Sequence, residues 1–172
     1  MAAYKTFETD RLLIKPTDIE DAAFIFNLLN TPKWIEFIGN RNIENIEDAK
    51  KYIENKMLPQ LHRLGFGNYT VILKSNKNKI GLCGLYDRED LDGIDIGFAF
   101  LPDFEGKGYA LEAASKLLQI ASTEFNLSQV SAITDLHNLA SQNLIKKLGF
   151  KKVGLTSISN QTKKLLLYKK IF

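Results

Sequence analysis

The sequence has few of the residues that build disulfides and metal centres. Its 172 residues include one cysteine, Cys83, so no internal disulfide can form. The only two histidines, His62 and His137, are far apart in the sequence. We therefore predict no metal site. A chain of this length buries roughly 70% of its unfolded surface on folding, so it needs no such staple.

The sequence also lacks a strong charge of either sign and a long apolar run. Lys plus Arg number 23 and Asp plus Glu number 20, and an excess of +3 is too small to indicate a nucleic-acid-binding protein. No stretch approaches the roughly 20 apolar residues of a membrane span, and the first ten residues lack the apolar core of a signal peptide. We therefore expect a cytoplasmic protein with one domain, residues 1–172, that binds neither nucleic acid nor membrane.

The hydrophobic pattern predicts strands and helices in mixed order. The predicted strands are residues 11–15, 68–74, 79–86, 93–101, 129–134, 150–158 and 163–171. The predicted helices are residues 19–29 behind a capping box of Thr17 and Glu20, a helix after Asn45 that runs to about Leu61, residues 109–125, and residues 139–148.

Prolines and short links define the connections between these elements. Thr31-Pro32 should end the first helix and Pro59 should kink the second. The links within residues 68–101 are too short for parallel crossovers, which indicates an antiparallel meander. The last two strands should form a hairpin around Ser159-Asn160. Together these elements indicate an α+β fold in which helices pack on a sheet.

A glycine-rich turn, Glu105-Gly106-Lys107-Gly108-Tyr109-Ala110, joins a predicted strand to a helix. Free backbone N–H groups and the helix dipole make such a helix start an anion site, and glycines let a ligand approach closely. The turn does not match a Walker loop, because Tyr109-Ala110 follow the second glycine where Lys and then Ser or Thr are needed. Leu111 likewise breaks the dinucleotide fingerprint. From these residues alone, a tight connection without a ligand is an equally good interpretation.

The same six residues resemble the (Gln/Arg)-Gly-x-Gly-x-(Gly/Ala) motif of the GNAT N-acetyltransferases, which holds the pyrophosphate of acetyl-CoA. Asn138-Leu139-Ala140-Ser141, followed by Lys147-Leu148-Gly149-Phe150, is similar to a signature of the branch typified by ribosomal-protein N-terminal acetyltransferases. The resemblance implies a single-domain GNAT fold, with a mixed central sheet splayed at the cofactor site and flanked by helices. It also implies that acetyl-CoA is the acetyl donor.

The resemblance implies how acetyl-CoA binds. Backbone groups of Phe98, Ala99 and Phe100 would pair with the pantetheine arm, although ordinary core packing also explains the two aromatic side chains. The pyrophosphate would be held by Glu105, Gly106, Lys107, Gly108, Tyr109 and Ala110. Asn138 would cap its helix and contact the CoA arm together with Ser141. Glu105 replaces the family's Gln or Arg, so we expect reduced charge complementarity and not lost binding.

The resemblance also implies catalytic groups. Asp95 stands where relatives often carry Glu, and it would act as the base, directly or through water. The alternative is a carboxylate on the solvent face of an edge. Many members carry a tyrosine acid where this sequence has Ile145, whose hydrocarbon cannot donate a proton. Ser141 is the hydroxyl that would take over this role, and the alternative is a purely local role beside the Asn138 cap.

Three further residues are candidates for the acceptor side. The resemblance implies that the first two helices line the acceptor side, so Trp34 and Phe37, placed between them, would shape the acceptor pocket, although aromatic core packing is the commoner role. An acidic turn that includes Asp87 would attract a cationic amine, but charged turns are usually only solvated.

The resemblance implies an acetyl-CoA-dependent N-acetyltransferase, which we expect to be a monomer or homodimer. The acetyl group would move to a primary amine, either a protein N-terminus or a small molecule, by direct attack on the thioester. One alternative is a non-catalytic acyl-CoA-binding module of the same fold. Another is a nucleotide or nucleic-acid binder, which rests on the glycine turn and mild basicity alone.

Overall fold

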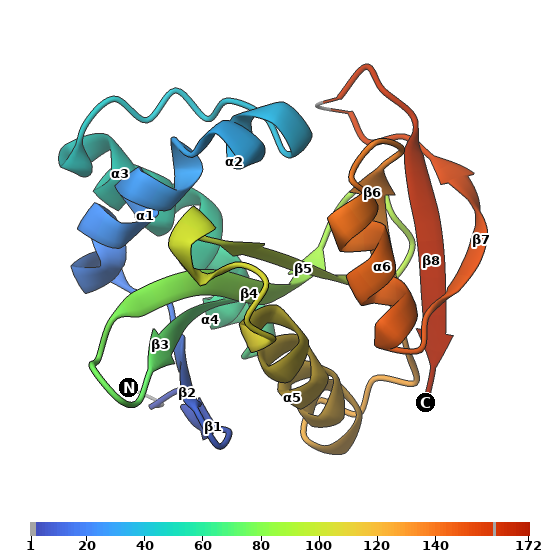
Figure 1. Cartoon of the computed structure of the whole chain (residues 1–172), viewed down its shortest axis with the longest axis horizontal. Helices are drawn as coiled ribbons and strands as arrows, with labels where there is room; N and C mark the ends of the chain where they lie inside the picture. The colour runs from blue at the N-terminus through green and yellow to red at the C-terminus, as the bar shows by residue number, and fades with distance from the viewer. Residues whose placement is uncertain (1–2, 160) are drawn as a thin grey trace.

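The described residues of the protein form one sheet of eight strands in the order β1-β2-β3-β4-β5-β6-β8-β7, as shown in the computed structural model of Figure 1. The structure describes residues 3–159 and 161–172. The strands are β1 (Phe7–Glu8), β2 (Leu12–Pro16), β3 (Asn68–Leu73), β4 (Lys79–Asp87), β5 (Ile94–Phe100), β6 (Gln129–Asp135), β7 (Lys151–Thr156) and β8 (Leu165–Ile171). The predicted meander of β3, β4 and β5 is confirmed, since these strands pair antiparallel with their sequence neighbours.

The sheet opens between β5 and β6. The β4–β5 ladder pairs β5 along its whole length, from Ile94 to Phe100. On the other side, β5 and β6 run parallel and share a single pair of partner residues, Asp95 and Ser131. Beyond Asp95 the two strands diverge, so the β6-facing edge of β5 has no strand partner there within the part of the chain that the structure describes (Figure 1). The mixed, splayed sheet expected from the sequence is confirmed.

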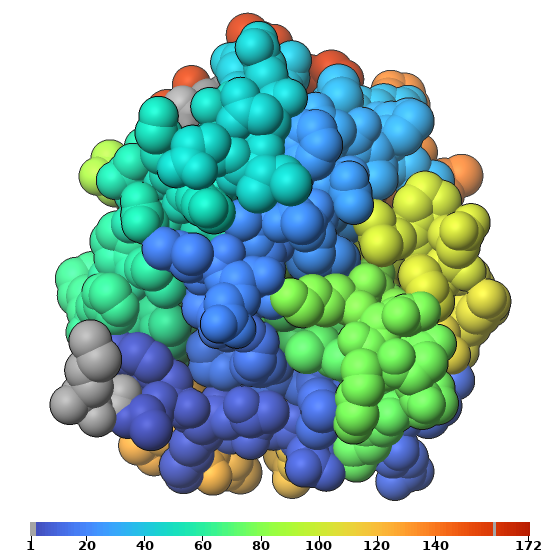
Figure 2. Space-filling model, turned by 90° about the vertical axis from the view of Figure 1, so that its left-hand side faces the viewer, coloured from blue at the N-terminus to red at the C-terminus, as the bar shows by residue number. Residues whose placement is uncertain are grey.

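Helices cover both faces of the sheet. They are η1 (Ile19–Asp21), α1 (Ala22–Leu29), α2 (Pro32–Phe37), α3 (Ile46–Tyr52), the π-helical turn η2 (Ile53–Met57), α4 (Leu58–Leu64), η3 (Pro102–Phe104), α5 (Tyr109–Thr123) and α6 (Leu139–Lys147). One core packs α5, through residues such as Leu117, against both parts of the sheet. A second core packs α1, α2 and α3 on Leu82 of β4. Figure 2 shows these N-terminal helices side by side on one end of the molecule.

The N-cap of the first helix lies one residue later than predicted, at Asp18 and not at Thr17. Asp18 is the N-cap of η1, because its Oδ1 accepts a hydrogen bond from the Glu20 amide at 2.9 Å. The Asp21 carboxylate completes the box by accepting from the Asp18 amide at 3.0 Å. The Thr17–Glu20 box is therefore wrong. The Thr17 hydroxyl is buried and lies 3.0 Å from the Thr70 hydroxyl of β3, so it bonds within the sheet.

Prolines begin helices here as well as ending them. Pro32 occupies the first turn of α2, where its missing N–H costs nothing. Trp34 and Phe37 therefore lie within a helix and not between two, which corrects the prediction. Pro59 stands in the first turn of α4, directly after the π-helical turn, and so marks the expected break in the second helix.

The C-terminal strands pair antiparallel, as the predicted hairpin requires. Asn160 of its turn lies outside the described residues. Within residues 3–159 and 161–172, we find no helix with both the length and the apolar character that a membrane crossing demands.

Candidate active site

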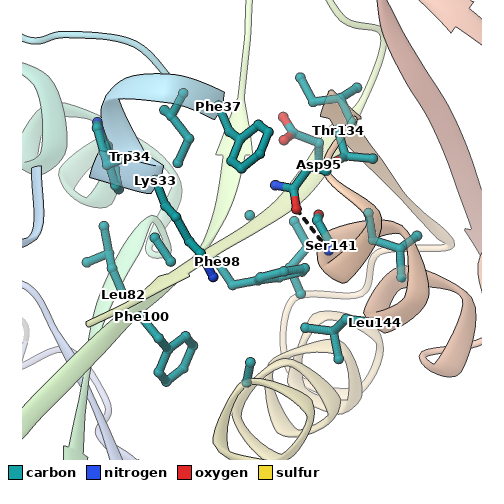
Figure 3. Close-up of a pocket in the computed structure, with 18 of the residues that line it drawn as sticks. Lys33, Trp34, Phe37, Leu82, Asp95, Phe98, Phe100, Thr134, Ser141 and Leu144 are labelled. Atoms are coloured by element: carbon teal, nitrogen blue, oxygen red, sulfur yellow. Dashed lines mark hydrogen bonds between the residues drawn. The ribbon is translucent and has the colours of Figure 1, made fainter. Parts of the chain in front are cut away.

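A cavity of about 750 Å³ occupies the gap between the diverging strands. Figure 3 shows Lys33, Trp34 and Phe37 of α2 on one side of it, Ser141 and Leu144 of α6 on the other, and Asp95 and Phe98 of β5 between them. The sequence-predicted residues that line it are Trp34, Phe37, Asp87, Asp95, Phe98, Ala99, Phe100, Glu105, Gly106, Gly108, Tyr109, Ala110, Asn138 and Ser141. Lys107 is the exception. Its ammonium donates to the Asp103 carbonyl oxygen at 2.9 Å.

The turn before α5 has backbone donors without acceptors. Gly106 and Gly108 adopt positive φ angles of 71° and 81°, a conformation that costs a residue with a side chain roughly 1–2 kcal/mol. Among the described residues, none of the N–H groups of residues 106–111 donates a hydrogen bond. These donors stand at the start of a 15-residue helix, whose dipole adds partial positive charge. The turn therefore has the properties of an anion site.

Arg11 braces this turn from outside the cavity. Its Nη1 donates to the Lys107 carbonyl oxygen at 3.0 Å, and its Nε donates to the Glu112 carboxylate at 2.7 Å. The guanidinium also lies 4.4 Å from the centre of the Tyr109 ring. Three contacts from one rigid, planar group hold the turn and the first turn of α5 in a fixed relation.

Glu105 does not face the anion site as an isolated negative charge. Its carboxylate forms an ion pair with Lys33 of α2, from the other side of the cavity. Figure 2 shows the segment around η3, in yellow, against the blue α2 region. Both side chains are partly exposed, so the pair is a weak contact between these two walls.

Asp95 is the most perturbed carboxylate of the cavity. It is 0% exposed, so it is not on the solvent face that the sequence left open. Its Oδ1 accepts a hydrogen bond from Arg88 Nε at 2.8 Å, and its buried Oδ2 has no partner among the described residues. Burial raises the pKa of Asp95, and the attraction of Arg88 only partly offsets this effect. A raised pKa brings a carboxylate closer to the value that suits a general base.

Two glycines make room for the aromatic residue beside this pair. A Cβ on Gly84 or Gly97 would lie 2.5 or 2.8 Å from atoms of the Tyr86 ring. The Tyr86 hydroxyl donates to Asn68 Oδ1 at 2.9 Å, and the Arg88 guanidinium lies 5.0 Å from the ring centre. Tyr86 therefore supports Arg88, which in turn holds Asp95.

Asn138 and Ser141 meet at the start of α6. The Asn138 side chain accepts a hydrogen bond from the Ser141 amide at 3.1 Å, drawn as the dashed line in Figure 3. The capping role of Asn138 is thus confirmed. The Ser141 hydroxyl lines the cavity and has no hydrogen-bond partner among the described residues. Ile145, one turn further along α6, is 1% exposed and offers only hydrocarbon.

The aromatic residues of the acceptor side belong to α2. Trp34 is 8% exposed, packs in the second core and also lines the cavity, and its role toward an acceptor stays a prediction. Its buried indole N–H has no acceptor among the described residues. Asp87 lines the cavity but is already paired with Arg63, whose Nη2 lies 2.7 Å from its carboxylate.

Comparisons with known proteins agree with this geometry. The family model "Acetyltransferase (GNAT) domain" matches residues 11–151, which is most of the chain. The chain belongs to the GNAT acetyltransferase family. It is an acetyltransferase, and its acetyl donor is acetyl-CoA.

Individual relatives support the family and its fold. The "Uncharacterized N-acetyltransferase p20" of Bacillus licheniformis is 28% identical over 153 residues, covering 88% of this chain and 85% of that protein. An acetyltransferase structure from Agrobacterium tumefaciens superposes with a TM-score of 0.83 at 21% identity, covering 100% and 97% of the two chains. RimL, a ribosomal L7/L12 α-N-protein acetyltransferase in complex with coenzyme A, gives 0.82 at 15% identity and 98% coverage of each chain.

Two parts of this GNAT site suit the donor chemically. The unused amides of residues 106–111 are the donors that a pyrophosphate needs, and the unpaired edge of β5 offers backbone groups to an extended arm. When bound, acetyl-CoA supplies the activated acetyl group.

Sequence reasoning missed Arg88, because the turn that contains it looked like a solvated acidic loop. The signal lies in the hairpin register. Asp87 pairs with Ile94 and Tyr86 pairs with Asp95, so Arg88 directly follows the strand that lies beside the carboxylate. Arg11 was noticed only as the first residue of a predicted strand, and no local pattern shows that it reaches Lys107.

Proposed function

We propose that this acetyltransferase acylates a primary amine, a protein N-terminus or a small-molecule amine, with Asp95 as the base and Ser141 as the acid. The observation that carries the proposal is the unpartnered, buried Oδ2 of Asp95 in the cavity that begins at the unused amides of residues 106–111. A carboxylate oxygen without a donor of its own is available to an amine or to a bridging water.

Each group has one task in this proposal. The amides of residues 106–111 bind the pyrophosphate, and the backbone of residues 98–100 binds the pantetheine arm. Asp95 accepts the proton that the attacking amine releases. The Ser141 hydroxyl donates a proton or a hydrogen bond to the departing sulfur, a role that Ile145 cannot take.

The acceptor's own pKa favours an α-amine. An α-amino group has a pKa of about 7.7–8.0 and a lysine side chain about 10.4, so much more of the α-amine is neutral near pH 7. The likeness to RimL, named for acting on a ribosomal-protein N-terminus, supports the same choice. The cytoplasmic location and the monomer or homodimer state stay predictions.

Two measurements test this function. Acetyl-CoA should raise the melting temperature of the protein, because it binds only the folded state. A panel of primary amines, followed by release of free CoA thiol, should then give amine-dependent turnover. Stabilisation without any amine-dependent thiol release would instead favour the non-catalytic acyl-CoA-binding module. If acetyl-CoA leaves the melting temperature unchanged, the proposed binding mode is contradicted.

A further inference from the structure

The carboxylates of the cavity are all neutralised by the protein itself. Four carboxylates line the cavity, and each has a cationic partner. The pairs are Asp87 with Arg63 at 2.7 Å, Asp95 with Arg88 at 2.8 Å, Glu105 with Lys33, and Asp135 with Lys163 at 3.7 Å. The lining therefore offers no spare negative charge that would attract a polycationic acceptor.

The cations of the cavity are in excess. Arg41, Lys56 and Lys147 also line it, and none of them has an ion-pair partner among residues 3–159 and 161–172. Lys147 belongs to α6. Arg41 follows α2, and Lys56 belongs to the π-helical turn η2, so both come from the N-terminal helical layer that holds Trp34 and Phe37. Short π-helical segments of this kind are frequent at functional sites.

Arg88 adds unused donors beside the base. Its Nε donates a hydrogen bond to Asp95, while Nη1 and Nη2 make no hydrogen bond within the described part of the chain. Its contact with the Tyr86 ring fixes the plane of the guanidinium. The two terminal nitrogens of a fixed guanidinium match the two oxygens of a carboxylate or phosphate.

We propose that the acceptor carries an anionic group, a carboxylate or a phosphate, close to its amine, and that Arg88, Arg41 and Lys56 bind this group. The inference rests on the proposed function, because the amine must reach Asp95 Oδ2 while the anion faces these cations. Polyamines and other polycationic amines are then poor acceptors, since they meet unpaired cations and no unpaired carboxylate.

Matched acceptors test the proposal by thiol release at fixed acetyl-CoA. The pairs are tripeptide amides that begin with Asp or Asn, and phosphoethanolamine against ethanolamine, with spermidine as the polycation. We expect kcat/KM to be at least about tenfold higher for the anionic member of at least one pair, equivalent to roughly 1.4 kcal/mol. The preferred pair identifies the anion as a carboxylate or a phosphate. Equal rates within both pairs, or spermidine as the best acceptor, would overturn the proposal.

Variants connect the preference to the named cations. In the double variant Arg41→Gln/Lys56→Gln, we expect the rate ratio between the anionic and neutral members to fall severalfold, mainly through KM. Lys51→Gln is the matched control, because Lys51 is an exposed lysine of α3 that does not line the cavity, and it should leave the ratio unchanged. An undiminished ratio in the double variant would contradict the role of these side chains.

A binding measurement separates this inference from the proposed function. If acetyl-CoA stabilises the protein but no amine is acetylated, the amine-transfer proposal fails by itself. The anion site is then measured by calorimetry on the CoA-loaded protein, with N-acetyl-aspartate α-amide against N-acetyl-asparagine α-amide and N-acetyl-phosphoethanolamine against N-acetyl-ethanolamine. Tighter binding of an anionic member, weakened by Arg41→Gln/Lys56→Gln, supports the site. Equal binding within both pairs contradicts it.

Discussion

The two ends of the cavity differ in the groups that line them: main-chain amides at one end and side chains at the other. At the end that we propose binds the phosphates (the phosphate end), the donors are main-chain amides of one continuous segment, residues 106–111, and side chains such as Arg11 only brace them. At the end that we propose binds the acceptor (the acceptor end), the polar and aromatic groups are side chains brought together from separate elements, such as Trp34 of α2, Arg88 and Asp95. The first arrangement tolerates many sequences that keep two glycines. The second changes with single substitutions, because each of its groups is one side chain.

The largest effect is expected where side chains do the chemistry. Asp95→Asn keeps the shape but removes the base, so kcat should fall roughly 1,000-fold, within the range known for proton transfer by a positioned side chain. Because burial raises the pKa of Asp95, the rate should be lost as the pH falls through a value above the ordinary 3.8. The pH dependence of kcat measures this limb. Asp90→Asn, at an exposed aspartate outside the cavity, should change neither rate nor profile.

Ser141→Ala tests the acid at the same end. We expect kcat to fall about 100-fold, the lower end of the same range, while the affinity for acetyl-CoA changes little. Single-turnover kinetics would measure the chemical step and calorimetry the affinity. Ser115→Ala, on an exposed position of α5, controls for losing a helical hydroxyl. A normal chemical step in Ser141→Ala would leave Ser141 with a local role beside the Asn138 cap.

Backbone geometry should dominate at the phosphate end. Gly108→Ala places a side chain at φ 81°, where its Cβ would lie 3.3 Å from Arg11 Nη2. The resulting strain of roughly 1–2 kcal/mol should weaken acetyl-CoA binding about tenfold. Gly65→Ala is the matched control, since Gly65 has φ 79° but caps α4 away from the cavity. It should lower the melting temperature without changing the affinity. Equal losses of affinity in both variants would contradict the special role of the turn.

Arg11→Met tests how much the Arg11 side chain contributes to holding the amides of residues 106–111 in place. It removes the bonds to Lys107 and Glu112 but no group of the cavity lining. Because Arg11 is partly exposed, we expect about 1 kcal/mol, or roughly a fivefold rise in the dissociation constant of acetyl-CoA. Lys5→Met, which breaks the ion pair with Glu124 at the other end of α5, should have no effect on it. If Arg11→Met binds normally, the turn holds its shape without the brace.

The smallest effect is expected at Glu105. Glu105→Gln should change the affinity for acetyl-CoA less than about twofold, because Lys33 already neutralises this carboxylate in a partly exposed pair. Lys33→Gln leaves the carboxylate unpaired beside the anion site, so it should weaken binding more than Glu105→Gln does. Calorimetry at low and high salt measures both. The reverse order would mean that the ion pair does not shield the phosphate end.

The contrast between the two ends also explains what the sequence could predict. The turn at residues 105–110 and the Asn138 cap are local, because chain neighbours supply their geometry, and both were located from short motifs. The strands from Asn68 to Phe100 and the helix α5 show strong periodicity and were predicted to within a few residues.

The failures have a common physical cause. The role of Pro32 depends on whether the following residues find a core, and Trp34 does so in the second cluster. Thr17 was a plausible cap until the Thr70 hydroxyl, far away in the sequence, engaged it. The partner of Asp95 depends on the register of a hairpin. Each of these outcomes depends on tertiary contacts, which a periodicity analysis does not contain.

The divergence of β5 from β6 affects how the fold stays intact through repeated cycles of ligand binding and release. The two portions of the sheet are held together chiefly by one shared core of side chains, which includes Leu117 of α5, Ile14 of β2 and Tyr168 of β8. Ladder bonds contribute little at this seam. A ligand that enters and leaves the gap therefore makes and breaks only its own contacts with the protein. The core packing that joins the two portions of the sheet stays intact. Ligand release and rebinding therefore require no strands to separate.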